Sequence, residues 1–216
     1  MGREKPIEGD GGLRLEFLRN KRRAQRFYRQ LSKVYDSWLR DLFWNERMRA
    51  YGLEMAGLRP GMEVLDVGCG TGFLSEGILE VTPRVWGLDI TPEQLRRAAR
   101  KLPIPLVRGD AENLPFRPEC FDAVLSSGSI EYWPEPVQAL REMHRVLRPA
   151  GIALVGGPTR PRDRLYRLLA DNMMLFYGEE EAIRMFAEAG FRQIQVGYTG
   201  PKWKPDLAIV TRGVKA

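Results

Sequence analysis

Short apolar runs alternate with amphipathic stretches along residues 61–213 of this chain, and this alternation limits the possible fold more than any other feature of the sequence. Strand, helix and strand in succession favour an α/β fold, with a mostly parallel sheet covered by helices on both faces. We predict helices at residues 72–81, 91–102, 136–147 and 179–189. The predicted strands span residues 63–68, 84–90, 105–110, 122–127, 152–157, 192–198 and 207–213.

Residues 1–57 show a different pattern. Between Phe27 and Leu42 apolar side chains recur at steps of three and four residues, which is the period of an amphipathic helix. The helix-breaking sequence GLRPG at residues 57–61 ends this region. We therefore expect a basic, helical N-terminal extension over residues 1–57 that acts as a lid, followed by one ligand-binding domain over residues 58–216.

The composition excludes several kinds of protein. With two cysteines and one histidine, the chain has too few ligands for a disulfide framework or a Cys/His zinc site, and we expect no metal. The most apolar long window, residues 165–177, contains charged side chains and is too short to cross a bilayer. We recognise no targeting peptide in the sequence and expect a cytoplasmic protein.

Positive charge is concentrated in one segment. Residues 14–33 contain eight basic residues and one acid, a net charge of +7, whereas the whole chain carries +6. The rest of the chain is therefore close to neutral. Such a basic segment can meet RNA, anionic lipid headgroups or only water.

A glycine-rich loop follows the first predicted strand, in the sequence LDVGCGTG at residues 65–72. Gly68, Gly70 and Gly72 let the backbone turn tightly away from the strand and come close to a ligand. Dinucleotide enzymes use a similar loop, and some glycine turns bind nothing. Asp66, however, puts a carboxylate beside the place where a dinucleotide's pyrophosphate would have to lie. A ligand with an ammonium group suits this loop better.

Two further acids end the next two predicted strands. Asp89 can accept hydrogen bonds from both hydroxyls of a ribose, and Asp110 can accept one from the exocyclic amine of adenine. The carboxyl ends of parallel strands form the crevice where open α/β sheets bind ligands. An ammonium group, a ribose and an adenine in this order describe S-adenosylmethionine. The alternative is that Asp89 and Asp110 only cap helices. Cys69 is expected to pack as a small buried residue.

With these motifs the chain resembles the class I S-adenosylmethionine-dependent methyltransferases, and in particular the plant-type 2-methyl-6-phytyl (or solanesyl) benzoquinol methyltransferases. The resemblance runs from about residue 27 to residue 215. The sequences LDVGCGTGF (65–73) and GDAENLPF (109–116) are common to many methyltransferases. More specific to the plant-type proteins are SSGSIEYWPEP (126–136), GEEEAIRMFAEAGF (178–191) and GPKW (200–203).

The resemblance implies a Rossmann-like fold with a seven-stranded sheet whose last hairpin is reversed. It also implies that Tyr28 and Tyr35 fold over the methionine end of the cofactor. The chain departs from the plant pattern, because we recognise neither a transit peptide nor a membrane anchor in it. The Arg-rich helix and the missing anchor suggest a prokaryotic relative. A further departure is Cys69, where the plant form usually has glycine. The residues that we assign to the cofactor, besides these tyrosines, are Asp66, Gly68, Cys69, Gly70, Thr71, Gly72, Asp89, Ile90, Asp110, Ala111, Glu112 and Ser127.

Methylation of an aromatic ring carbon needs a nucleophile ortho to a phenolic hydroxyl, and this carbon becomes reactive as the hydroxyl loses its proton. Glu131 is our candidate general base, because it follows the fourth predicted strand in a partly apolar setting that would raise its pKa. Tyr132 and Trp133 are candidates to stack on the quinol ring, and Trp203 is a candidate for a further substrate wall. The alternatives are that Trp133 belongs to the core and that Glu131 caps the helix that begins near Pro136.

Other functions compete with quinol methylation. The basic segment favours nucleic acid, but SSGSIEYW after the fourth strand lacks the Asn/Asp-Pro-Pro-aromatic motif that holds an exocyclic amine, so we do not expect a nucleic-acid substrate. A prenylated quinol lies in the bilayer, and we expect Arg14–Lys33 to contact an anionic membrane surface. Three alternatives stay open: another small acceptor such as a menaquinol or ubiquinol precursor, RNA as the acceptor, and a protein that binds S-adenosylmethionine without transferring its methyl group.

Overall fold

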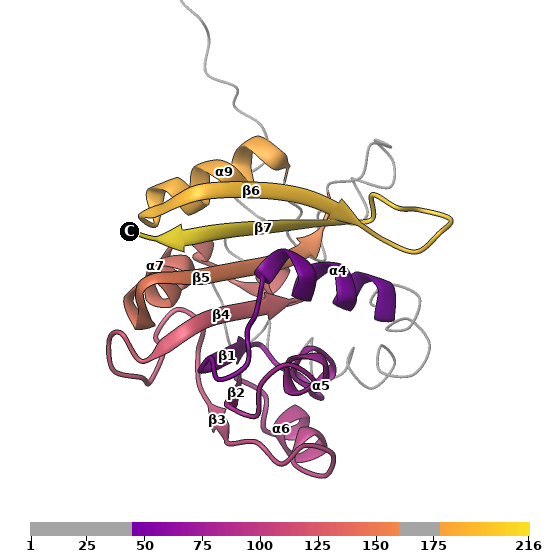
Figure 1. Cartoon of the computed structure of the whole chain (residues 1–216), viewed down its shortest axis with the longest axis vertical. Coiled ribbons are helices and arrows are strands. Elements are labelled where there is room, and N and C mark those ends of the chain that lie inside the picture. The colour runs from indigo at the N-terminus through magenta and orange to yellow at the C-terminus, as the bar shows by residue number, and fades with distance from the viewer. Residues whose placement is uncertain (1–44, 160–177) are drawn as a thin grey trace, which may run out of the picture.

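The computed structural model describes residues 45–159 and 178–216, which form one seven-stranded sheet with helices on both faces (Figure 1). The strand order is β3-β2-β1-β4-β5-β7-β6. β1 to β5 pair in parallel, whereas β7 is antiparallel to both of its neighbours. This confirms the predicted Rossmann-like α/β fold with a reversed last hairpin. The strands are β1 (Val64–Val67), β2 (Val85–Asp89), β3 (Leu106–Arg108), β4 (Phe121–Ser127), β5 (Leu147–Pro158), β6 (Phe191–Thr199) and β7 (Ala208–Lys215).

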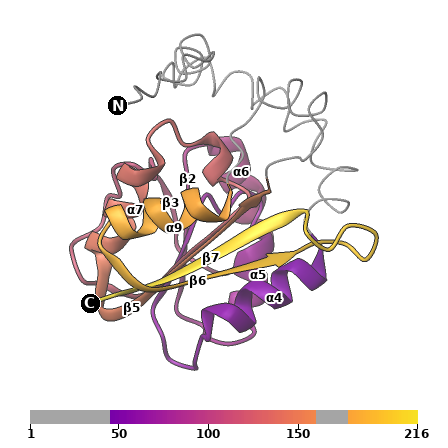
Figure 2. The same ribbon diagram turned by 90° about the horizontal axis from the view of Figure 1, so that it is seen from above.

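Helices cover the two faces of the sheet as separate layers, with α4 and α5 on one side and α7 and α9 on the other (Figure 2). Adjacent residues of β1 point to opposite faces: Val64 packs with α5, and Leu65 packs with α7. Asp66 shares the face of Val64 and so points toward α5. The helices are α4 (Glu46–Ala56), α5 (Phe73–Leu79), α6 (Pro92–Ala98), α7 (Pro136–Val146) and α9 (Glu179–Glu188), with a short 3-10 helix η1 (Ile130–Tyr132).

α4 is the described part of the predicted N-terminal extension. The Asn45 side chain accepts a hydrogen bond from the Met48 N–H at 3.2 Å, and Gly57 ends the helix in the left-handed conformation with φ 62°. α4 packs against α5 and β5. The basic segment Arg14–Lys33 lies outside the described residues. Among the helices that are described, none has the length and apolar character needed to cross a membrane.

Two strands differ most in length from the prediction. β5 begins at Leu147, earlier than expected, because Leu147 pairs with Phe121 before the register shifts at a bulge. β3 ends at Arg108, because the chain turns after it: the Asn113 N–H donates to the Asp110 carbonyl at 3.0 Å. This turn leaves the Asp110 side chain beyond the end of β3, at the carboxyl edge of the parallel strands.

Candidate active site

The glycine loop turns the chain from β1 into α5. Gly68, Gly70 and Gly72 have φ values of 71°, 54° and 93°, a region that favours glycine. The Gly68 and Cys69 N–H groups donate to the Leu88 carbonyl at 2.7 and 2.9 Å, which holds the loop against β2. A Cβ atom on Gly68 would lie 2.5 Å from the Ser129 side chain. The loop after β4 therefore packs directly on the glycine loop.

Asp66 lies under this loop with 1% of its surface exposed. Its Oδ2 accepts a hydrogen bond from the Ser75 hydroxyl at 2.6 Å. The pKa of Asp66 is raised to about 7, mainly by burial. The hydrogen bond from Ser75 lowers this pKa, and the charge of the neighbouring Asp89 raises it. A cation placed beside this carboxyl would favour its ionised form. Ser75 was not among the predicted residues, although a hydroxyl in the first turn after the glycine loop is a usable sequence signal.

Asp89 ties the glycine loop to the start of the next helix. Its Oδ2 accepts the Gly70 N–H at 2.9 Å and its Oδ1 accepts the Thr91 N–H at 2.8 Å. The helix-capping alternative thus accounts for one oxygen only. Burial raises the pKa of Asp89, and the two N–H donors oppose this rise. The Thr91 hydroxyl is a third hydrogen-bond donor to this carboxylate. A carboxylate has about four acceptor sites, so capacity for a ribose hydroxyl is left. Ile90 follows, half-buried, at the end of β2.

Asp110 and its neighbours form a turn at the end of β3. The Asp110 Oδ1 accepts the Glu112 N–H at 3.0 Å, so this carboxylate stabilises a turn and caps no helix. Ala111 is buried and Glu112 is half-buried. Cys69, in the glycine loop, is buried against Gly87, and burial raises the pKa of its thiol, which keeps it neutral. The structure therefore brings the predicted acids to three neighbouring strand ends.

The loop after β4 begins at Ser127 and carries the candidate base. Gly128 has φ 67°, and the Ser126 and Ser129 hydroxyls lie 2.6 Å apart. The Ser129 hydroxyl also donates to the Val67 carbonyl at 3.4 Å. The sequence analysis did not predict a role for Ser129. No local pattern indicates one, because its partner Val67 lies on β1, far away in the sequence. These contacts fix the start of the loop against the glycine loop.

Glu131 lies in η1 with 3% of its surface exposed, and its Oε2 has no hydrogen-bond partner among the described residues. Burial raises its pKa to about 8, and a backbone N–H opposes this rise. The N-cap of α7 is Glu135, so the alternative that Glu131 caps this helix is wrong. A buried carboxyl of this kind can take a proton from a weak acid.

The predicted aromatic substrate residues lie in different surroundings. Tyr132 is half-buried. Trp133 is 6% exposed and packs in the core cluster with α7, which agrees with the alternative that Trp133 belongs to the core. Trp203 is 64% exposed on the connection between β6 and β7, which projects from the sheet (Figure 1). Residues 45–159 and 178–216 thus do not enclose Trp203, and its role in a substrate wall stays a prediction. Tyr28 and Tyr35 lie outside the described residues.

Comparisons with known proteins agree with this geometry. Residues 65–155 match a family model described as a methyltransferase domain. The chain is 45% identical over 193 residues to the chloroplastic 2-methyl-6-phytyl-1,4-hydroquinone methyltransferase of Arabidopsis thaliana, a match that covers 87% of this chain but 57% of the relative. It is also 30% identical over 221 residues to the demethylmenaquinone methyltransferase of Staphylococcus aureus (strain JH9), covering 84% of this chain and 90% of the relative.

Solved structures share the fold at lower identity. A S-adenosylmethionine-dependent methyltransferase from Thermotoga maritima superposes with a TM-score of 0.71 at 22% identity, covering 89% of this chain and 100% of the other. The Haemonchus contortus phosphoethanolamine N-methyltransferase 2, solved with S-adenosyl-L-methionine, gives a TM-score of 0.71 at 16% identity, covering 94% of this chain and 60% of the other. These likenesses concern the fold alone.

Proposed function

This chain belongs to the class I S-adenosylmethionine-dependent methyltransferases, and we propose that it methylates a ring carbon of a prenylated benzoquinol. The observation that carries the proposal is Glu131, a buried carboxyl with a raised pKa in the loop that packs on the glycine loop. The identity of 45% to a protein named as a 2-methyl-6-phytyl-1,4-hydroquinone methyltransferase supports the substrate class.

The residues at the three strand ends suit S-adenosylmethionine. Asp66 is a buried acid with a raised pKa, and no positive charge of residues 45–159 and 178–216 contributes to that pKa, which fits an ammonium partner. Asp89 keeps acceptor capacity for a ribose hydroxyl beside its bonds to Gly70 and Thr91, and Asp110 stands at the next strand end for the adenine amine. When bound, the cofactor supplies a methyl group on a positively charged sulfur.

Glu131 would act on the acceptor. A phenolic hydroxyl has a pKa of about 10, so its loss of a proton at neutral pH needs an acceptor group nearby. The pKa of Glu131, about 8, lies between this value and that of an ordinary carboxyl, so that its anion is a stronger base than exposed glutamate. Loss of the hydroxyl proton to Glu131 would raise the electron density at the ortho carbon, which would bond to the methyl group in line as the bond between that methyl group and sulfur breaks. The ring carbon would then lose its hydrogen as a proton, which restores the aromatic ring. Tyr132, which is half-buried and follows Glu131 in the chain, would contact the ring.

The test is methyl transfer from labelled S-adenosylmethionine to a panel of acceptors. We expect label in 2-methyl-6-prenyl-1,4-hydroquinones, and none in bulk RNA. Label in demethylmenaquinol alone would favour a second candidate function, the methylation of a menaquinol precursor. The Staphylococcus aureus relative supports this candidate, because the match covers 90% of its length. Cofactor binding without transfer to any acceptor would contradict enzymatic function.

We also propose that the enzyme works in the cytoplasm at the surface of a membrane, where a lipophilic quinol is available. The segment Arg14–Lys33 has a net charge of +7, and anionic lipid attracts such a segment. Co-sedimentation with anionic liposomes should be strong at low salt and weak when Arg22, Arg23 and Arg26 are replaced by glutamate. Equal sedimentation of the two proteins would refute the role of the segment.

A further inference from the structure

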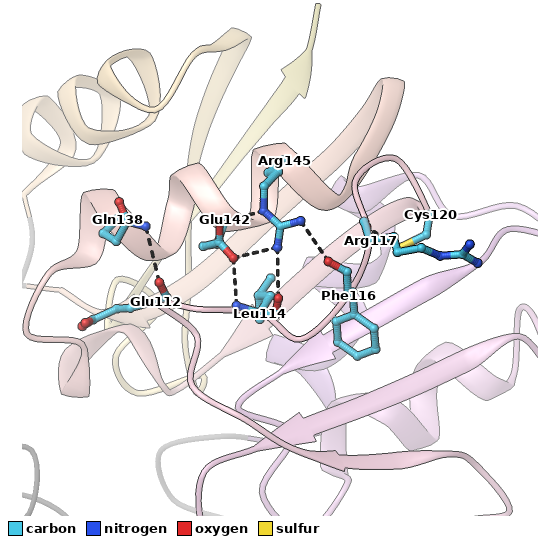
Figure 3. Close-up of polar contacts among 8 residues, drawn as sticks. All are labelled: Glu112, Leu114, Phe116, Arg117, Cys120, Gln138, Glu142 and Arg145. Atoms are coloured by element: carbon cyan, nitrogen blue, oxygen red, sulfur yellow. Dashed lines mark hydrogen bonds and ion pairs between the residues drawn. The ribbon is translucent and has the colours of Figure 1, made fainter.

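One face of α7 holds the segment 112–116, which follows the predicted adenine partner Asp110 (Figure 3). Gln138, Glu142 and Arg145 are spaced by four and three residues, so they project from the same side of the helix. The groups that they contact on the segment are main-chain groups. Because β3 ends at Arg108, the segment lies beyond the strand pairing that holds β3.

An ion pair makes most of these contacts. Arg145 donates to the Phe116 carbonyl at 2.9 Å and to the Leu114 carbonyl at 3.0 Å. Glu142 accepts the Leu114 N–H at 2.8 Å and is bound to Arg145 through both of its oxygens, each at 2.8 Å. The hydrogen bond from Arg145 holds the pKa of Glu142 below its usual range, so both partners are charged. The N–H and the carbonyl of Leu114 are thus both bound by one charged pair.

The same segment is linked to the loop that carries Glu131. The Glu112 Oε1 accepts the Glu135 N–H at 2.9 Å, and the Glu112 carbonyl accepts a hydrogen bond from the Gln138 side chain at 3.4 Å. Glu135 lies between η1 and α7. The start of α7 therefore holds the residue that follows Ala111, while the ion pair holds the residues after it.

We propose that Glu142 and Arg145 are positioning residues for the adenosine end of the cofactor. They fix the main-chain course of the turn that presents Asp110, Ala111 and Glu112, and a binding group displaced by about 1 Å loses much of its effect. The proposal rests on cofactor binding at these strand ends, which is part of the proposed function, and it does not depend on the quinol.

The experiment measures binding of S-adenosylhomocysteine and of 5′-methylthioadenosine, which lacks the methionine end, by calorimetry. Arg145→Lys keeps the charge but loses the planar fork that reaches two carbonyls, and Glu142→Gln removes the ion pair. We expect each variant to bind both ligands about tenfold more weakly, the usual scale for one or two hydrogen bonds. Arg141→Lys is the matched control, since Arg141 lies on the same helix but pairs with Glu188 at 3.1 Å. This control should bind within about twofold of the wild type.

A purely structural role would lower the melting temperature of the variants without changing the affinity of the folded protein for either ligand, and that result would overturn the proposal. A loss of affinity for S-adenosylhomocysteine alone would place the effect at the methionine end and would overturn it too. If Arg145→Lys does not fold, the affinity of Glu142→Gln for the two ligands tests the proposal by itself. A wild type that binds neither ligand refutes the cofactor assignment itself, whereas normal binding without quinol methylation refutes only the substrate.

Discussion

Glutamine has nearly the same shape as glutamate but cannot take up or release a proton. Glu131→Gln therefore removes the candidate base and leaves the space that the side chain fills almost unchanged. In the wild type the carboxyl is 3% exposed and its Oε2 has no hydrogen-bond partner in the described part of the chain, so an amide can occupy the same space. A positioned general base contributes a factor of about 10² to 10⁴ to the rate. We expect kcat to fall by about this factor, while affinity for S-adenosylhomocysteine stays within about threefold because Glu131 is not among the assigned cofactor residues.

The raised pKa also predicts the pH dependence of the wild type. The base form of Glu131 dominates only above its pKa of about 8, so the rate should rise about tenfold per pH unit below this value and level off above it. The folded state binds this proton more tightly than the unfolded chain, in which the pKa is 4.5. The free energy of unfolding of the wild type should therefore fall as the pH rises from about 4.5 to 8, and Glu131→Gln should lack this contribution.

The assay is the initial rate of methyl transfer to the prenylated hydroquinone between about pH 6 and 9, below the pKa of a phenol. Glu135→Gln is the matched control, because Glu135 is an exposed acid on the same loop. Its kcat should stay within about twofold of the wild type. A Glu131→Gln enzyme with a near-normal rate and an unchanged rise toward pH 8 would remove Glu131 from the role of base.

Three further predictions concern the cofactor loop and the aromatic residues. Asp66 has a pKa of about 7 and should ionise when the ammonium group of S-adenosylhomocysteine binds, so calorimetry in buffers of different ionisation enthalpy should show release of most of a proton at about pH 6 and clearly less at about pH 7; no release at about pH 6 would contradict this. Gly68→Ala should lower the melting temperature more than Gly61→Ala, since both have positive φ but only the first meets a neighbour, Ser129; equal losses would refute the contact. Trp133→Ala should cost about 3–5 kcal/mol of stability as a core truncation, whereas Trp203→Ala should change stability by less than about 0.5 kcal/mol, both read from denaturant unfolding.

The sequence predicted the layers of this fold because its local patterns agree with the tertiary structure. Each strand of the parallel sheet is a short apolar run, and α7 presents one buried stripe that includes Leu140 and Met143. The acids at the strand ends were predictable for the same reason, since parallel strands bring their carboxyl ends to one edge. The strand positions alone were enough to predict where Asp66, Asp89 and Asp110 lie.

The contacts between distant segments were not predictable from the sequence. Glu142 and Arg145 are spaced as an ordinary helical ion pair, and nothing local shows that they bind the main chain of Leu114 and Phe116. The choice between core and wall for Trp133 likewise depends on which neighbours α7 brings to it. Propensity and spacing describe one element at a time, whereas these roles arise where two elements meet.

The environment of Glu131 shows this dependence most clearly, because a glycine on another strand helps to create it. Gly157 lies on β5, and a Cβ atom there would come within 2.6 Å of the Ile130 side chain and 3.8 Å of the Glu131 Oε2. The missing side chain lets η1 pack directly on the backbone of β5. That close packing excludes water from the carboxyl, and the exclusion of water is the main cause of its raised pKa. The basicity of Glu131 is therefore a property of the contact between η1 and β5, and the sequence of the loop alone could indicate only that a carboxyl stands in the right place.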